Sequence, residues 1–196
     1  VSLGVSKSTV GRVLARAGAE GWRGGLAGSA GMPTFLLGLS GLAYTALAVT
    51  DPTLPVLDLS GSVVDLTRQL CDIESVSGNE RAIADAIEAS LAGLDHLEVI
   101  RDGDAIVART SQGLDRRVVI AGHIDTVPVN NNLPVRLDGD FLVGRGTVDM
   151  KAGVAVALKL AADLAAPAVD VTWIWYDHEE VASHLNGLGR LASSRP

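Results

Sequence analysis

Five side chains of types that bind metals or move protons fall into three short stretches of the sequence. His123 and Asp125 lie in GHIDTVP, Asp149 lies in GRGTVDMKAG, and Glu179 and Glu180 lie in YDHEE. One imidazole with several carboxylates is a ligand set that suits a pair of zinc-like ions sharing a carboxylate. Two such ions about 3.5–4 Å apart can activate water and polarise an amide carbonyl. The predicted chemistry is therefore metal-assisted hydrolysis of an amide.

Each stretch on its own has a plainer explanation. The histidine can simply lie in a turn, Asp149 can cap the following helix, and the glutamate pair can belong to a solvated loop. However, Asp149 follows His123 by 26 residues (149 − 123), and Glu179 follows Asp149 by 30 (179 − 149). All three stretches are expected at the carboxyl edge of one sheet, where open α/β sheets bind ligands. The combination favours one common site.

Two helices are predicted ahead of the first stretch. Apolar side chains recur at helical intervals over residues 62–73. Ser77 and Glu80 fit the S-x-x-E capping box, in which a hydroxyl and a carboxylate satisfy free N–H groups at a helix start. We therefore expect a second helix that begins at Ser77.

Strands lead into the chemical residues. The sequence around 102–104 predicts a hairpin, and residues 118–121 predict a buried strand that ends at GHIDTVP. An alanine-rich helix follows GRGTVDM and ends by Pro167, and VDVTWIWY predicts the strand before the glutamate pair. Strand, helix, strand in this order predicts a βαβ unit in an α/β fold, with a mixed sheet covered by helices.

Composition narrows the class of partner. A formal net charge of −7 argues against a general nucleic-acid or anionic-membrane binder, so we expect a small-molecule substrate. The single cysteine, Cys71, cannot form an internal disulfide, which favours a reducing, cytoplasmic compartment. A metal site must then use histidine and carboxylates, as catalytic ions do more often than structural zinc.

Residues 1–55 differ from the rest, and we expect them to form a glycine-rich apolar extension unrelated to the domain over 56–196. GVSKSTVGRVL resembles part of a helix-turn-helix repressor, but the helix before it would have to lie upstream of Val1, so DNA binding is disfavoured. GMPTFLLGLSGLAYTALAVTDPTLPVLDL resembles the end of lanthionine-synthetase cyclase domains. Residues 33–49 fall short of the ~20 apolar residues of a membrane span, so export or anchoring is the less favoured alternative.

The three chemical stretches resemble the signature segments of the co-catalytic zinc amidohydrolases, which include succinyl-diaminopimelate desuccinylases, acetylornithine deacetylases, aminoacylases and glutamate carboxypeptidases. The resemblance runs over residues 57–190, and LTRQLCDIESVSGNE and NGLGRL look most like the actinobacterial desuccinylases. It implies a three-layer zinc-peptidase-like catalytic domain. The implied reaction hydrolyses N-succinyl-LL-2,6-diaminopimelate to succinate and LL-2,6-diaminopimelate, for diaminopimelate and lysine synthesis. A related deacylase of N-acylated amino acids, such as an acetylornithine deacetylase, stays open.

The resemblance also implies a role for each residue. His123 would bind one of two zinc ions and Asp125 would orient it, while Asp149 would bridge both ions through a residue whose peptide bond to Met150 is cis. Glu180 would bind the other ion, and Glu179 would be the general base. Cobalt can substitute for zinc in such sites.

Members of this family are longer than the present sequence. They carry a further acidic ligand after the glutamate pair, a lid and dimerisation domain, and a final histidine ligand, and complete members are homodimers. Only residues 181–196 follow Glu180, and His184 lies too near in sequence to replace the distant ligand. We therefore expect an incomplete catalytic domain with an unpaired sheet edge, and an inactive fragment as the alternative to an active enzyme.

Overall fold

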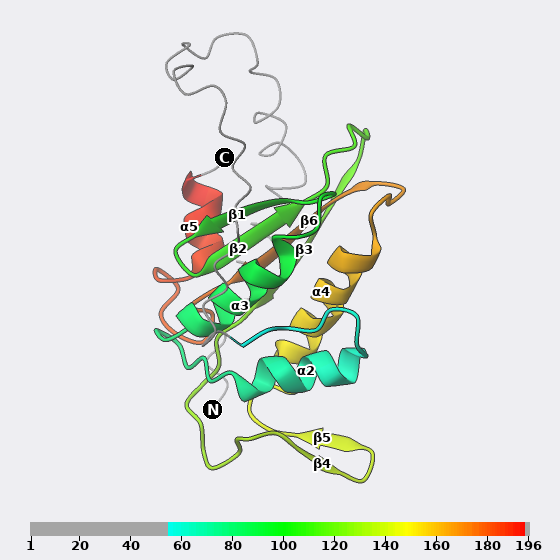
Figure 1. The fold of residues 1–196 in the computed structure, drawn as a ribbon. Helices are drawn as coiled ribbons and strands as arrows, with labels where there is room; N and C mark the ends of the chain where they lie inside the picture. The colour runs from blue at the N-terminus through cyan, green and yellow to red at the C-terminus, as the bar shows by residue number, and fades with distance from the viewer. Residues whose placement is uncertain (1–54, 195–196) are drawn as a thin grey trace, which may run out of the picture.

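A four-stranded mixed sheet forms the centre of the computed structural model, which describes residues 55–194 (Figure 1). The predictions made for residues 1–54 lie outside the described residues. Strand order in the sheet is β1-β2-β6-β3, and a separate two-stranded hairpin, β4-β5, lies beyond one end of it. The strands are β1 (Glu98–Asp102), β2 (Ala105–Arg109), β3 (Arg117–His123), β4 (Arg136–Asp138), β5 (Phe141–Val143) and β6 (Asp170–Tyr176). The helices are α2 (Val63–Asp72), α3 (Arg81–Leu91), α4 (Lys151–Asp163) and α5 (Gly187–Ser194).

The predicted βαβ unit is confirmed. Strands β3 and β6 pair in parallel, from Arg117 opposite Asp170 to His123 opposite Tyr176, with α4 between them in sequence. The predicted hairpin is also present, since β1 and β2 pair antiparallel around Gly103, which has a positive φ of 61°. This arrangement brings the carboxyl ends of β3 and β6 side by side.

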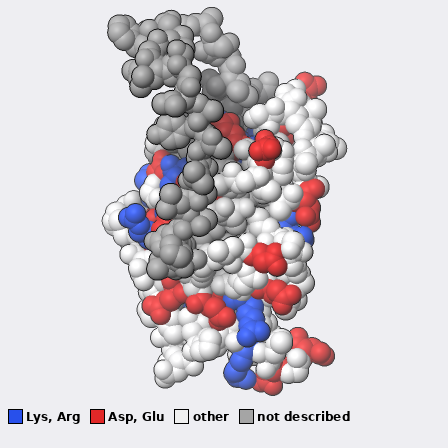
Figure 2. All heavy atoms as spheres, viewed as in Figure 1, with Lys and Arg blue, Asp and Glu red and all other residues white. Residues whose placement is uncertain are grey.

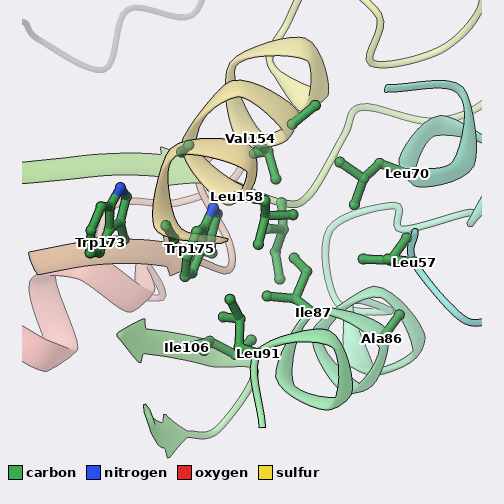
Figure 3. Close-up of a cluster of buried hydrophobic side chains, with 14 of the residues drawn as sticks. Leu57, Leu70, Ala86, Ile87, Leu91, Ile106, Val154, Leu158, Trp173 and Trp175 are labelled. Atoms are coloured by element: carbon green, nitrogen blue, oxygen red, sulfur yellow. The ribbon is translucent and has the colours of Figure 1, made fainter. Parts of the chain in front are cut away.

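Helices cover both faces of the sheet. Helices α2, α3 and α4 share one face (Figure 1), and their buried side chains pack on Trp173 and Trp175 of β6 (Figure 3). Side chains alternate across a strand, so Ile174 and Tyr176 point to the opposite face. There they pack with Leu188 and Leu191 of α5 in a second, smaller cluster. Every residue of β6 is buried as a result, as in a central strand covered on both sides.

A strand is present at residues 118–121, as predicted, but the prediction that these residues are buried is wrong. Strand β3 is present, but within residues 55–194 it pairs only with β6, so it lies at the edge of the described sheet. Val118 is accordingly 46% exposed, and the next three residues are half-buried. The apolar run therefore predicted a strand correctly, but this strand is at the edge of the described sheet and not in its centre.

The prediction that a helix starts at Ser77 is also wrong. Helix α3 begins at Arg81, and neither Ser77 nor Glu80 makes a capping-box hydrogen bond. The Ser77 hydroxyl instead donates to Asp125 Oδ2 at 2.6 Å, and Glu80 accepts from the N–H of Gly78 at 2.9 Å. Gly78 has a φ of 94°, a left-handed conformation that cannot continue into a helix.

On the face drawn in Figure 2, acidic side chains lie among scattered arginine and lysine side chains, and the hairpin end of the molecule carries both signs. Of the helices within residues 55–194, none has the length and apolar character that a membrane crossing requires.

Candidate metal centre

The site lies where β3 and β6 end together. Both strands run in the same direction, and their last paired residues are His123 and Tyr176. One further hydrogen bond, from the N–H of Ile124 to the carbonyl of Tyr176 at 2.9 Å, joins the two segments just beyond the ends of the strands. The residues that follow, Asp125 on one side and Glu179 on the other, must therefore lie close in space.

A third segment, the turn before α4, brings in Asp149. The N–H of Lys151 donates to the carbonyl of Gly146 at 2.9 Å, which closes the turn. The buried ammonium of Lys151 donates to the carbonyls of Leu70 and Ile73 at 3.1 and 2.7 Å and so fastens this turn to the end of α2. The peptide bond between Asp149 and Met150 is cis, as the sequence resemblance implied.

Three of the five chemical side chains converge on one point. His123, Asp149 and Glu180 each offer a ligand atom, and these atoms all lie within 4.8 Å of one another. Nε2 of His123 lies 3.1 Å from Oδ1 of Asp149. Among residues 55–194 this is the only group of three such side chains placed to hold a metal ion. Imidazole nitrogen and carboxylate oxygen are both ordinary zinc ligands, so this group fits a divalent ion.

The orientation of His123 favours metal binding through Nε2. Its Nδ1 lies 3.0 Å from the backbone carbonyl oxygen of Asp125, which can only accept a hydrogen bond. Nδ1 must therefore carry a proton, so Nε2 is the nitrogen that can bind an ion, once the ion displaces the proton that Nε2 donates to Asp149 in the metal-free chain. This pairing of a donated Nδ1–H with a ligating Nε2 is usual for histidine ligands.

Asp125 is fully buried and holds the site together without joining the ligand group. Its Oδ1 accepts the N–H of Glu179 at 3.0 Å, and its Oδ2 accepts the N–H of Glu180 at 3.0 Å and the hydroxyl of Ser77 at 2.6 Å. Burial alone would raise the pKa of Asp125, but the bonds from His123, Ser77 and the two N–H groups lower it to about 2. Asp125 is therefore an ionised anchor for both the histidine and the glutamate pair.

The site has an excess of negative charge that favours a bound cation. Burial works against a charged His123, yet hydrogen bonds to Asp125 and Asp149 and the charge of Glu179 raise its pKa to about 9. Burial and the neighbouring carboxylates of Asp149, Glu179 and Asp125 raise the pKa of Glu180, although His123 opposes this. Carboxylates crowded in this way are stabilised by a positive charge among them.

The five predicted residues thus lie together at one sheet edge. His123, Asp149 and Glu180 form the candidate ligand group, Asp125 accepts hydrogen bonds from the backbone beside it, and the N–H of Glu179 donates to Asp125. Ser77 and Glu80 also belong to this region and were not predicted there, because their spacing also matches a helix cap. The glycine directly after Ser77 was the available signal that no helix starts there.

A family model matches the part of the chain that contains these five residues. Residues 119–195 match the family model described as Peptidase family M20/M25/M40. This match, over 77 of the 196 residues (195 − 119 + 1), confirms the resemblance drawn from the three motifs.

Two relatives are similar to this chain over most of its length. The succinyl-diaminopimelate desuccinylase of Corynebacterium glutamicum is 49% identical over 147 residues. A Mycobacterium tuberculosis protein named for the same activity is 50% identical over 142 residues. Each alignment covers 72% of this chain and 40% of the relative, so the chain spans less than half the length of either protein.

Solved structures share the fold at lower identity. The aminopeptidase PepT of Bacillus cereus superimposes with a TM-score of 0.51 at 22% identity, over 63% of this chain and 38% of that one. Human carnosine dipeptidase 1 gives a TM-score of 0.53 at 18% identity, over 63% of this chain and 33% of that one. These likenesses support the mixed sheet with helices on its faces.

Proposed function

We propose that the chain carries part of the active site of a metal-dependent amide hydrolase that acts on N-succinyl-LL-2,6-diaminopimelate. The observation that carries this proposal is the convergence of His123, Asp149 and Glu180, with Glu179 next to them and outside the ligand group. The names of relatives about half identical in sequence support the choice of substrate. Zinc is the proposed metal, with cobalt as a substitute.

His123, Asp149 and Glu180 would hold the ion through one imidazole nitrogen and two carboxylates. When bound, such an ion polarises the amide carbonyl and lowers the pKa of water. A second ion, with Asp149 as the shared ligand, is part of the proposal and requires ligands beyond this group.

The residues of the chain supply the proton transfers and the geometry. Glu179 would take a proton from the attacking water and pass it to the leaving amine nitrogen, so that the amide and water become succinate and a free amine. Asp125 would keep Glu179 and Glu180 in fixed positions through their N–H groups. Adjacent glutamates can thus have separate roles, one in proton transfer and one in metal binding.

The test measures zinc content by elemental analysis together with release of amine from N-succinyl-diaminopimelate. We expect Glu179→Ala to keep its zinc and lose turnover, and Glu180→Ala to lose zinc. Glu98→Ala is the matched control, because Glu98 lies on β1 in an ion pair with Arg109. Turnover that survives Glu179→Ala would contradict the assigned base.

Metal binding without turnover is the second candidate function. The number of candidate ligands favours it. Residues 55–194 bring three such side chains together, whereas a two-ion site of the implied kind uses more. Zinc bound by the parent chain with no hydrolysis of the succinylated substrate would establish this candidate and overturn the first.

A further inference from the structure

The turn that carries the glutamate pair is held by buried carboxylates from two other segments. The N–H of His178 donates to Oε1 of Glu80 at 3.3 Å, while those of Glu179 and Glu180 donate to the two oxygens of Asp125 at 3.0 Å each. His178 has a φ of 58°, in the left-handed region. Successive N–H groups turned toward anions in this way form a nest that fixes the local backbone.

One short segment, residues 75–80, positions both carboxylates: it contains Glu80, and its Ser77 donates a hydrogen bond to Asp125. Its backbone is joined to the chain after β3, because the N–H of Thr126 donates to the carbonyl of Ser75 at 2.9 Å and the N–H of Ser77 donates to the carbonyl of Thr126 at 3.1 Å. The hydroxyl of Ser75 donates to the carbonyl of Ile124 at 2.7 Å. The hydroxyl of Ser77 then reaches Asp125.

The carboxylate of Glu80 links the turn at Gly78 to the turn at His178. Its side chain is fully buried and accepts the N–H of Gly78 at 2.9 Å on both oxygens. Nδ1 of His178 lies 3.5 Å from Oε1 of the same carboxylate and 2.7 Å from Asp177. A buried carboxylate is expensive in free energy unless it is paired. Because the side chain of Glu80 makes no capping hydrogen bond to α3, its partners in the fold are the turns at Gly78 and His178.

We propose that Ser77 and Glu80 are positioning residues, which set the location of Glu179 and Glu180 through Asp125 and the backbone of His178. Neither residue belongs to the ligand group. The consequence for metal binding and hydrolysis rests on the proposed function, whereas the hold on the turn is a property of the metal-free chain. The two can therefore be tested separately.

The first test is amide hydrogen exchange of the metal-free chain, followed residue by residue by NMR. We expect Ser77→Ala to reduce protection at the N–H of Glu180, and Glu80→Ala to reduce it at the N–H of His178, each by about tenfold, as for a lost hydrogen bond. Amides of β6 should keep their protection. Ser90→Ala is the matched control, since its hydroxyl donates to Ile87 within α3.

Conservative variants separate positioning from general destabilisation. Ser77→Thr keeps a hydroxyl and Glu80→Gln keeps an oxygen acceptor, so both should show the protection of the parent chain. If Glu80→Ala fails to fold, the loss expected for Ser77→Ala decides the test. A uniform loss of protection across β6 as well as the turn would overturn the proposal. Unchanged protection at residues 178–180 would overturn it equally.

The second test titrates Co²⁺ alone and records its absorption spectrum. Ser77→Ala should weaken Co²⁺ binding by about 10–100-fold, the effect of losing a group that orients ligands, and should alter the spectrum, while Ser77→Thr restores both. Parent-like affinity and spectrum in Ser77→Ala would overturn the link between this segment and the site. A parent chain that binds no Co²⁺ would overturn the proposed function, and the exchange result would still decide the hold on the turn.

Discussion

Nε2 of His123 faces Oδ1 of Asp149 at 3.1 Å, although 26 residues separate them in the sequence (149 − 123). The ring is held on its other side by the carbonyl of Asp125 at 3.0 Å. A buried strand end and the turn before α4 thus define one position for a ligand atom before any ion arrives. Such preorganisation reduces the ordering that accompanies binding.

Replacing His123 should remove most metal affinity. We expect His123→Asn to weaken Zn²⁺ binding by at least about 100-fold, the upper end of the loss caused by removing a supporting group. Isothermal titration of the metal-free chain measures this. His96→Asn is the control, because Nε2 of His96 donates to the carbonyl of Ala161, away from the site. Equal zinc affinity in both variants would contradict the ligand assignment.

Lys151 should stabilise the fold through two buried hydrogen bonds. Lys151→Met leaves the carbonyls of Leu70 and Ile73 without these donors, and we expect the free energy of unfolding to fall by about 2–3 kcal/mol. Urea unfolding followed by circular dichroism measures the change. Lys159→Met should have a smaller effect, since Lys159 is partly exposed and donates to one carbonyl, that of Leu59.

Cys71 should make stability fall at alkaline pH. Burial raises the pKa of its thiol to about 11, above the value of 9.0 for an unperturbed thiol. Between these values the unfolded chain loses the proton and the folded chain keeps it, so the unfolded state is favoured as pH rises. At pH 10 the loss should be about 1 kcal/mol relative to pH 8.

Urea unfolding of the parent and Cys71→Ala at the two pH values isolates this contribution. Burial lowers the pKa of Lys151 to about 8, which gives a pH dependence of opposite sign, but Lys151 is present in both chains. The parent should lose more stability than Cys71→Ala between pH 8 and pH 10. A parallel fall in the two chains would show that the thiol ionises equally in the folded and unfolded states.

Arg190 should fasten α5 to the sheet. It donates to Asp177 at 2.8 and 3.2 Å and to Asp102 at 3.0 Å, and Asp177 is buried. Arg190→Met leaves that carboxylate without its cation, and we expect about 2 kcal/mol of lost stability after allowance for the exposure of Arg190. Arg136→Met tests the reasoning, because its pair with Asp138 is exposed and should contribute little. Chemical denaturation of both variants provides the comparison.

The chemical residues could be predicted because each is of a reactive type and lies directly after a strand or before a helix. The parallel pairing of β3 and β6 then followed from the order of elements. Ser77 and Glu80 could not be found in this way, because a capping box is a local pattern and the contacts that replace it are long-range: Ser77 and Asp125 are 48 residues apart.

Burial was harder to predict than the elements themselves. Val118 lies in an apolar run typical of a central strand, yet it belongs to the edge strand of the described sheet. The hairpin β4-β5 was not predicted at all, because each of its strands has only three residues, too few for an alternating pattern to show. Neither feature alters the position of the ligand group.

The parallel register of β3 and β6 also has a consequence for biosynthesis. Arg117 pairs with Asp170 across 53 residues (170 − 117), so the pair closes only after the intervening helix has been made. Contacts of such sequence separation form slowly compared with helices and hairpins. A nascent chain on the ribosome can build α2, α3 and the β1-β2 hairpin first, but Glu180 reaches His123 only after both β3 and β6 have been made. Acquisition of metal by this group would therefore have to follow the pairing of β3 with β6.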